Sequence, residues 1–489
     1  MKATRYRIIT VFLVIAALLA AGCTGTTGTS STVTTGTAAA SATAQNTAQA
    51  GTAPGGSPPS GTPPSGSPPS GSPPGGSGPG GSPPGSSSGS SSYTFSGVYT
   101  LNGGTATETN ARYTSTTRDV SGVYVTNGGA LTLVNPTIVT SGDSSSNDAS
   151  SFYGLNGAVL ANGGSTVTIN GGTITTTGSG ANGAIPTGAG TMISLTDVTI
   201  MASGSGGHGV MATNGGTLIL KNVNIATTGA NGAPLATDRG SGTVTATGGA
   251  ITSSGRDSPG IYSTGKIAVT DAKITSTGTE AAVIEGFNSI ILTNTALTGG
   301  VDKTGGTMIY QSMSGDADVG TGTFTMNGGS YTATAGPAFF VTNTNAVITL
   351  TGVSVTIASD TLIKATATDR WGTSGKNGGK VSFTADNEKL AGSLSTDSIS
   401  SITATLKNGS MLTGTINTAA LNLDATSTWT VTGDSTLTSL SDAGGISGTG
   451  ITNIIGNGNT VTYDRSLAAN SALGGKTYTL VNGGTLTPE

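Results

Sequence analysis

The chain has 489 residues, enough for several domains, but its composition is unlike that of an ordinary globular enzyme. It contains 81 glycines, while only 9% of its residues are charged and 4% are aromatic. The formal net charge of −4 and the lack of a clustered basic patch argue against a nucleic-acid partner. A single cysteine excludes intramolecular disulfide bonds, so the fold must be stabilised by other contacts.

Residues 1–22 have the features of a lipoprotein signal peptide. Basic residues precede an apolar run from Ile8 to Ala21, which is too short to span a bilayer comfortably, and Cys23 follows a small-residue stretch that resembles a lipobox. Because Cys23 is the only cysteine, we predict that it is acylated and anchors the protein to the outer side of a prokaryotic membrane. The alternatives are a simple secretory signal with an incidental cysteine and an uncleaved membrane helix.

Residues 23–92, which begin with the lipid-attachment Cys23, are predicted to form a disordered stalk. Thr, Ala, Ser, Gly and Pro make up almost all of this segment, and from residue 56 it repeats Gly-Ser/Thr-Pro-Pro units. Such a composition cannot form a core, and Pro-Pro units favour the extended polyproline conformation. The stalk would hold the remaining domain, residues 93–489, away from the membrane.

An eight-residue phrase recurs along residues 93–489. In each copy, positions one and three are apolar, position five is Asn, Asp or Gly, and position eight is aliphatic. Copies occur at 193–200, 218–225, 267–274 and 290–297, and a shorter copy at 131–135. From Asp197 to Asn294 the Asn, Asp or Gly slot returns every 23 to 26 residues. Alternation predicts strands, and Asn, Asp and Gly tolerate the left-handed backbone of a sharp corner.

A third short apolar run, ending in Asn-Gly-Gly, precedes several copies of the phrase, as at 121–129, 156–164 and 208–216. Three strands and three turns in each repeat predict one coil of a right-handed parallel β-helix, an all-β solenoid of three sheets. One coil cannot bury its own apolar face, so stability must come from stacking neighbouring coils.

The phrase resembles the repeat of pectate-lyase-like β-helices, in which stacked asparagines form a ladder at the corner between the second and third sheets. The resemblance covers about residues 97–357 and implies the fold, with little said about activity. Nearer the C-terminus, residues 427–440 resemble a phrase of autotransporter passenger domains and bacterial surface adhesins, which are also β-helices. This second resemblance implies a rod displayed at the cell surface.

Three groups of residues invite a catalytic or metal-binding interpretation. Gly207-His208-Gly209 matches the Gly-His-Gly of β-helical polygalacturonases, but the same slot in other coils holds turn formers, and the Asp-Asp pair and the Arg-Ile-Lys of those enzymes are absent. We therefore expect His208 to be a turn residue. Asp238-Arg239 and Arg256-Asp257 could serve a lyase, but they lie 18 residues apart, which is not one coil. We expect them at different corners, as solvated turn charges.

Asp316 and Asp318 have the spacing that opens many calcium-binding loops. The third acidic ligand and the closing Glu are missing, so a polar turn is favoured over a Ca²⁺ site, and no other cofactor is expected.

The repeat blurs in residues 361–390, which we interpret as an irregular excursion from the coil. Asp369, Arg370 and Trp371 form the most plausible ligand contact there, since an exposed Trp beside charged groups can stack on a sugar ring. The alternative is that Trp371 caps the coil beneath the excursion.

The sequence favours a non-catalytic, adhesin-like surface protein that binds extracellular glycans, surface polymers, surface proteins or other cells through many weak polar contacts. The alternative is a carbohydrate-active enzyme, a polysaccharide lyase or glycoside hydrolase on the same fold. Ice binding, suggested by Thr-x-Thr phrases, is disfavoured because the matching slots vary among Thr, Ser, Ala, Lys and Asn.

Overall fold

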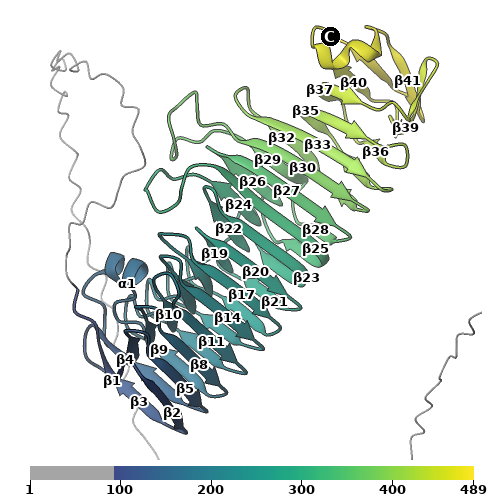
Figure 1. Cartoon of the computed structure of the whole chain (residues 1–489). Helices are drawn as coiled ribbons and strands as arrows, with labels where there is room; N and C mark the ends of the chain where they lie inside the picture. The colour runs from purple at the N-terminus through teal and green to yellow at the C-terminus, as the bar shows by residue number, and fades with distance from the viewer. Residues whose placement is uncertain (1–92) are drawn as a thin grey trace, which may run out of the picture. The chain divides into compact units, whose positions relative to one another are not determined.

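The strands of residues 93–489 wind in successive coils around one axis, and nearly all of them pair in parallel with the strands of neighbouring coils (Figure 1). These are the residues that the computed structural model describes. The predicted signal peptide, Cys23 and the predicted stalk lie outside them. The predicted three-sheet parallel β-helix is confirmed. Within the described range, no helix has the length and apolar character needed to cross a membrane.

Sheet 1 contains the first strand of each coil. Its members are β1 (Ser96–Asn102), β4 (Val120–Thr126), β7 (Val159–Ala161), β10 (Ala184–Pro186), β13 (Val210–Ala212), β16 (Leu235–Thr237), β19 (Ile261–Ser263), β22 (Ala282–Glu285), β24 (Thr307–Tyr310), β26 (Phe339–Thr342), β29 (Thr361–Ala365) and β32 (Ser393–Thr396). Most of these strands are only three or four residues long, and several are buried on both faces. Something must therefore cover the outer face of this sheet.

Sheet 2 contains the strands that precede the Asn/Asp/Gly corner. They are β2 (Thr105–Thr109), β5 (Ala130–Val134), β8 (Thr166–Asn170), β11 (Met192–Thr196), β14 (Thr217–Lys221), β17 (Thr243–Thr247), β20 (Lys266–Thr270), the first halves of β23 (Ser289–Gly299) and β25 (Thr321–Ala333), β27 (Asn345–Thr351), β30 (Lys380–Asp386) and β33 (Ser401–Lys407). Their inward residues are buried aliphatics, whereas their outward residues are mostly Thr and Ser, as the alternation predicts.

Sheet 3 follows the corner. It contains β3 (Arg112–Ser115), β6 (Thr137–Thr140), β9 (Thr173–Thr176), β12 (Thr199–Ala202), β15 (Asn224–Thr227), β18 (Ala250–Ser253), β21 (Lys273–Ser276), the second halves of β23 and β25, and β28 (Ser354–Ile357). Further along the axis the same position is taken by β31 (Lys389–Ala391), β34 (Met411–Gly414) and β36 (Thr428–Val431).

The corner between sheets 2 and 3 has the predicted left-handed backbone and side-chain ladder. The φ angles of Asp197, Asn222, Asp271 and Asn294 lie between 48° and 56°, and Gly248 has φ 69°. The Asn222 amide donates to the Asp197 carboxylate at 3.2 Å, and Asn294 donates to Asp271 at 2.6 Å. Each bond joins one coil to the next, so the corner residues reinforce the stacking of the strands.

The coil becomes irregular towards the C-terminus. Strand β35 (Ile416–Leu423) pairs with both β32 and β33, and β37 (Ser435–Ser441) and β40 (Thr460–Tyr463) continue the stack. The pairs β38 (Ile446–Ser447) with β39 (Gly450–Ile455) and β41 (Tyr478–Val481) with β42 (Thr485–Pro488) are antiparallel, and the 3₁₀ helix η1 covers Ala468–Leu473. Tyr113 lies in the core at the first coils, the coils that follow are filled by aliphatic residues, and large aromatics return later, among them Phe324, Phe339 and Trp429.

Candidate functional site

The outer face of sheet 1 carries a column of mostly apolar side chains. Strand register stacks, in order along the axis, Tyr124, Leu160, Ile185, Met211, Ala236, Tyr262, Val283, Met308 and Phe340. Because the same strands also send aliphatic side chains into the core, they read in the sequence as continuous apolar runs, such as Phe339-Phe340-Val341.

The first half of this column is sealed. The short helix α1 (Asn147–Tyr153) sits beside the first coils, and Leu160, Ile185, Met211 and Ala236 form a buried cluster with Phe95 and Tyr124 (Figure 1). The Phe152 carbonyl at the end of α1 accepts hydrogen bonds from Thr213 Oγ1 at 3.0 Å and Asn214 Nδ2 at 2.7 Å. These bonds fix the helix to the coil.

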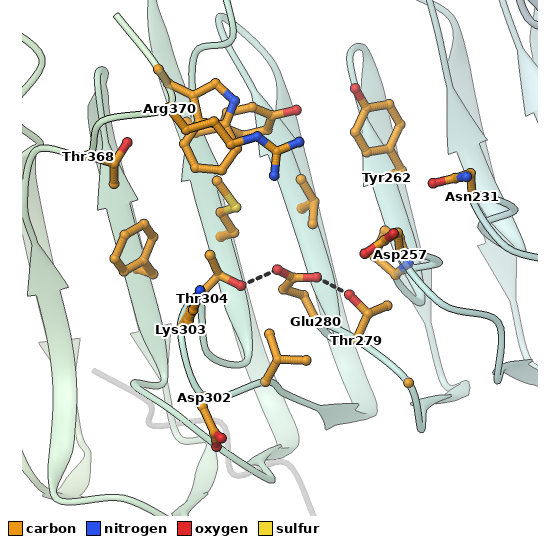
Figure 2. A pocket seen from close by; sticks show the side chains of 18 of the residues that line it. Asn231, Asp257, Tyr262, Thr279, Glu280, Asp302, Lys303, Thr304, Thr368 and Arg370 are labelled. Carbon is orange, nitrogen blue, oxygen red and sulfur yellow. Dashed lines mark hydrogen bonds between the residues drawn. The ribbon is translucent and has the colours of Figure 1, made fainter. Parts of the chain in front are cut away.

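The second half of the column is the floor of a groove of about 920 Å³. Tyr262, Val283, Met308 and Phe340 line it, and the Tyr310 and Trp371 rings pack against this floor (Figure 2). The volume lies at the upper end of the range for small-molecule sites. An apolar floor with two polar-tipped tyrosines is suited to a ligand that has both apolar faces and hydroxyl groups.

The walls of the groove come from loops at opposite edges of sheet 1. One wall consists of the turns that precede the sheet-1 strands, with Asn231, Asp257, Pro259, Gly278, Thr279, Glu280, Val301, Asp302, Lys303 and Thr304 (Figure 2). The other wall is the loop 366–379 between β29 and β30, which contributes Thr368, Asp369, Arg370 and Trp371. The groove is therefore built where the coil departs from its repeat.

The three residues predicted to contact a ligand all line this groove. The Trp371 ring lies 5.0 Å from that of Tyr310, and the Arg370 guanidinium lies 4.7 Å from the Trp371 ring. Trp371 is partly buried against Met308 and Phe340, so it covers the coil beneath and borders the groove at once. Its role in ligand binding stays a prediction.

The 366–379 loop is shorter than the predicted excursion, because residues 361–365 and 380–386 are regular strands. The buried Asn377 amide donates to the Thr368 carbonyl at 2.6 Å and to the Trp371 carbonyl at 2.7 Å, and the Asp397 carboxylate accepts from Ala367 N at 2.7 Å. These contacts hold the loop in shape.

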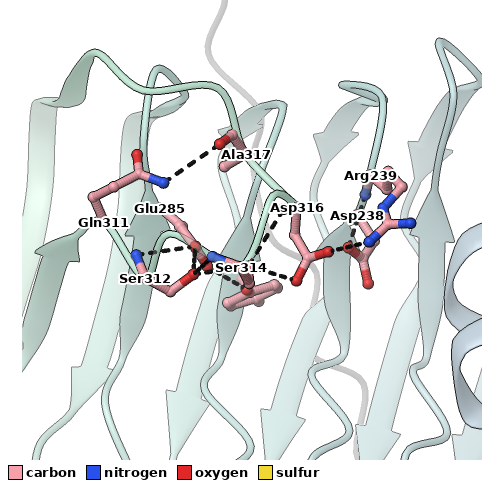
Figure 3. A network of polar contacts seen from close by, with 9 residues as sticks. Asp238, Arg239, Glu285, Gln311, Ser312, Ser314, Asp316 and Ala317 are labelled. Carbon is pink, nitrogen blue, oxygen red and sulfur yellow. Dashed lines mark hydrogen bonds and ion pairs between the residues drawn. The ribbon is translucent and has the colours of Figure 1, made fainter. Parts of the chain in front are cut away.

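A buried carboxylate supports the tyrosines of the groove. Glu285 is 1% exposed, and its Oε2 accepts hydrogen bonds from the Tyr262 and Tyr310 hydroxyls, each at 2.9 Å. Its Oε1 accepts from Ser312 N at 3.2 Å and from the Ser312 hydroxyl (Figure 3). Four donors compensate the burial of this carboxylate, so Glu285 joins two groove residues to the loop 311–320.

Asp238, Arg239 and Asp316 form a second polar group on the same face (Figure 3). Arg239 donates to Asp316 at 2.9 Å and lies 3.8 Å from the Phe152 ring of α1, so it bridges α1 and the 311–320 loop. Burial raises the pKa of Asp238 to about 7, opposed by the Arg239 backbone N–H at 2.7 Å and augmented by Asp316 and Glu285. Asp238 is more buried than the solvated turn charge that was expected, whereas the Arg239 side chain is 42% exposed and is held in an ion pair.

The weak calcium candidate, Asp316 with Asp318, does not form a metal cluster. The Asp316 carboxylate accepts from Arg239 and, at 2.8 Å, from the Ser314 hydroxyl. No group of three or more His, Cys, Asp or Glu residues that could hold a metal occurs in residues 93–489.

His208 lies in the turn before β13. Its backbone N–H donates to Asn182 Oδ1 of the preceding coil at 2.9 Å, and its Nδ1 lies 3.3 Å from the Ala233 carbonyl of the following coil. Burial lowers the His208 pKa to about 4, so the ring is neutral near pH 7. Arg256 pairs with Asp257 in the turn before β19, whereas Arg239 follows β16, so the two arginines do lie at different corners.

Sequence reasoning missed the floor of the groove and its support: Tyr262, Val283, Glu285, Met308, Tyr310 and Phe340. A signal for them was present. Several sheet-1 strands, such as Val159–Ala161 and Val210–Ala212, are apolar at every position, which indicates burial on both faces. After Tyr124, the next aromatic residue in the column is Tyr262.

Comparison with known proteins identified no matching family model, no matching curated sequence and no matching solved structure.

Proposed function

We propose that this protein is a non-catalytic, adhesin-like surface protein whose β-helix binds an extracellular glycan in the groove on sheet 1. The observation that carries the proposal is the packing of Trp371 and Tyr310, 5.0 Å apart, over an apolar floor between walls rich in polar side chains. Aromatic rings provide large contact area at low entropic expense, and carboxylates, hydroxyls and amides provide the hydrogen bonds that sugar hydroxyls need.

Attachment to the cell is part of the same proposal. The lipobox-like residues before Cys23 support a lipid anchor, and the Pro-rich segment after it supports a spacer between the membrane and the β-helix. Metabolic labelling with a fatty acid should mark the wild-type chain and not Cys23→Ser, and the variant should appear in the medium. Equal labelling of both chains would contradict the anchor.

Glycan binding is tested with the purified chain on a glycan array, followed by affinity measurements on the best ligand. Trp371→Ala should weaken binding about fivefold or more, because stacking of an aromatic ring is worth on the order of 1 kcal/mol. Phe287→Ala is the matched control, since Phe287 is 68% exposed and does not line the groove. Unchanged affinity of Trp371→Ala would contradict the proposed site.

A carbohydrate-active enzyme is the second candidate, favoured by one observation. Asp238 and Glu285 lie on the same face of sheet 1, and burial raises the pKa of Asp238 to about 7, a value that suits a general acid. Incubation with polygalacturonate and neutral polysaccharides, with and without calcium, would release reducing or unsaturated ends if this is correct. That turnover should be lost in Asp238→Asn, and turnover of this kind would replace the non-catalytic proposal.

A further inference from the structure

We infer that the groove selects glycans rich in hydrogen-bond donors and positive charge, namely polymers of amino sugars with free ammonium groups, over polyuronates. This inference rests on the proposed glycan-binding function and names the ligand class of the same groove.

The charges that line the groove are predominantly negative. Asp257, Glu280, Asp302 and Asp369 contribute four carboxylates, whereas Lys303 and Arg370 contribute two cations. Arg256 offsets part of this excess through its exposed ion pair with Asp257. A uronate polymer would bring further carboxylates against this surface, whereas an ammonium group would meet oppositely charged acceptors on the wall.

The floor of the groove also favours a ligand that donates hydrogen bonds, for a reason independent of the charges on the walls. A carboxylate can only accept hydrogen bonds, so the Tyr262 and Tyr310 hydroxyls donate their protons to Glu285, each at 2.9 Å. Any further hydrogen bond at these two phenolic oxygens must be one that they accept. Glu285, buried beneath the groove, therefore sets both tyrosines to receive a donor from a ligand.

The cations of the groove are not placed as a uronate clamp. The Arg370 guanidinium lies 4.7 Å from the Trp371 ring, so part of it is engaged with the aromatic face, and Lys303 is an exposed side chain on the opposite wall. A carboxylate clamp needs two or more donors directed at one point, ideally from a bidentate Arg. Figure 2 instead shows Glu280 between the hydroxyls of Thr279 and Thr304 in the middle of the wall.

The test compares three sets of oligosaccharides of equal length: β-1,4-linked glucosamine, N-acetylglucosamine and α-1,4-linked galacturonate. Binding of the purified chain is measured by calorimetry, at a pH where the free amine is protonated and at two salt concentrations. We expect the glucosamine oligomer to bind at least about tenfold more tightly than the galacturonate oligomer, and this preference should shrink at high salt because exposed charges are screened.

A double variant, Asp257→Asn with Glu280→Gln, tests the wall directly. It should weaken binding of the glucosamine oligomer about fivefold or more and leave binding of the N-acetylated oligomer within about twofold, because only the former carries a charge. Asp148→Asn is the control, since Asp148 is an exposed carboxylate on α1, outside the groove.

The outcomes separate the two proposals. Equal or tighter binding of galacturonate, or a double variant that keeps the wild-type preference, overturns the inferred ligand class. The glycan site is retained in that case if binding still depends on Trp371. Absence of binding to all three oligomers and to the glycan array removes the proposed function and this inference together.

Discussion

The two halves of the outer face of sheet 1 share one repeat but have opposite surroundings. In the first half, Leu160, Ile185 and Met211 are buried in a cluster with Phe95 and Tyr124, and the apolar column becomes a second, sealed core beside α1 (Figure 1). In the second half, the column continues through Val283, Met308 and Phe340, but the cover is limited to Trp371 and its loop, and a groove remains. The strands thus determine where apolar surface lies, and the inserted segments determine whether it is buried or offered to a ligand.

The sealed half should be the more sensitive to loss of side-chain volume. Met211→Ala would leave an enclosed cavity between sheet 1 and its cover, whereas Met308→Ala would only deepen a groove that water can enter. We expect the free energy of unfolding in urea to fall by about 3 kcal/mol for Met211→Ala and by about half of that for Met308→Ala. Equal losses would show that the groove is closed in solution and would break the comparison.

Glu285→Gln tests the support beneath the open half. The glutamine side chain keeps the shape, but its NH₂ group faces donors instead of accepting from them, so the contacts with Tyr262, Tyr310 and Ser312 cannot all persist. We expect a loss of about 2 kcal/mol in unfolding free energy and weaker glycan binding. For the unfolding free energy the control is Glu280→Gln, because Glu280 meets only the hydroxyls of Thr279 and Thr304, which can turn to water. For glycan binding the control is Asp148→Asn, since Asp148 lies on α1 and outside the groove. A similar loss in both variants would argue against a special role for Glu285.

Asp238 should make stability depend on pH at the boundary between the two halves. Its folded-state pKa is raised to about 7 from 3.8, so the folded protein binds the proton more tightly, and this contribution is fully present below about pH 4 and lost as the pH rises through 7. Relative to wild type, Asp238→Asn should therefore be more stable at pH 8 than at pH 5, by roughly 2 kcal/mol. Thermal unfolding at both pH values measures this, and parallel pH profiles would contradict it.

Arg239 joins the cover of the sealed half to the loop 311–320 beside the open half. Arg239→Ala removes the ion pair with Asp316 and the contact with the Phe152 ring, and we expect a loss of about 1 kcal/mol, since the arginine is partly exposed. Proteolysis should become faster at α1 and in 311–320. Arg256→Ala, which removes an exposed ion pair, should leave stability unchanged. If Arg239→Ala does not change the rate of proteolysis at α1, then α1 and the 311–320 loop are stabilised independently.

The fold could be predicted from the sequence because each coil repeats the same short residue pattern. The alternation of apolar residues and the Asn or Asp at each corner are local signals, and repetition made them unambiguous. The corners behave as predicted, with Asn222 and Asp271 in the left-handed region and joined to neighbouring coils. The contribution of Asp369, Arg370 and Trp371 to a groove was also predictable in outline, since a break in the repeat concentrates charge there.

The floor of the groove and the polar network beneath it were not predicted, because they depend on contacts between distant loops. Arg239 and Asp316 are 77 residues apart, and no feature of the sequence around either residue predicts their ion pair. Burial of Asp238 results from the same packing. The continuous apolar runs of sheet 1 did signal that its outer face is covered, but which part is covered follows from α1 and the 366–379 loop, whose positions the repeat does not encode.

The ladder at the Asn/Asp/Gly corner also has a consequence for how this chain can change. Before the irregular C-terminal coils, the segments that depart most from the repeat are α1, 311–320 and 366–379, and they enter at the two corners on either side of sheet 1. Between sheets 2 and 3 the corner stays short, with one or two left-handed residues, because an added residue there would break hydrogen bonds to neighbouring coils. The corner between sheets 2 and 3 therefore fixes the register of strand pairing between coils. New loops or grafted peptides can be accommodated at the other two corners without a shift in that register.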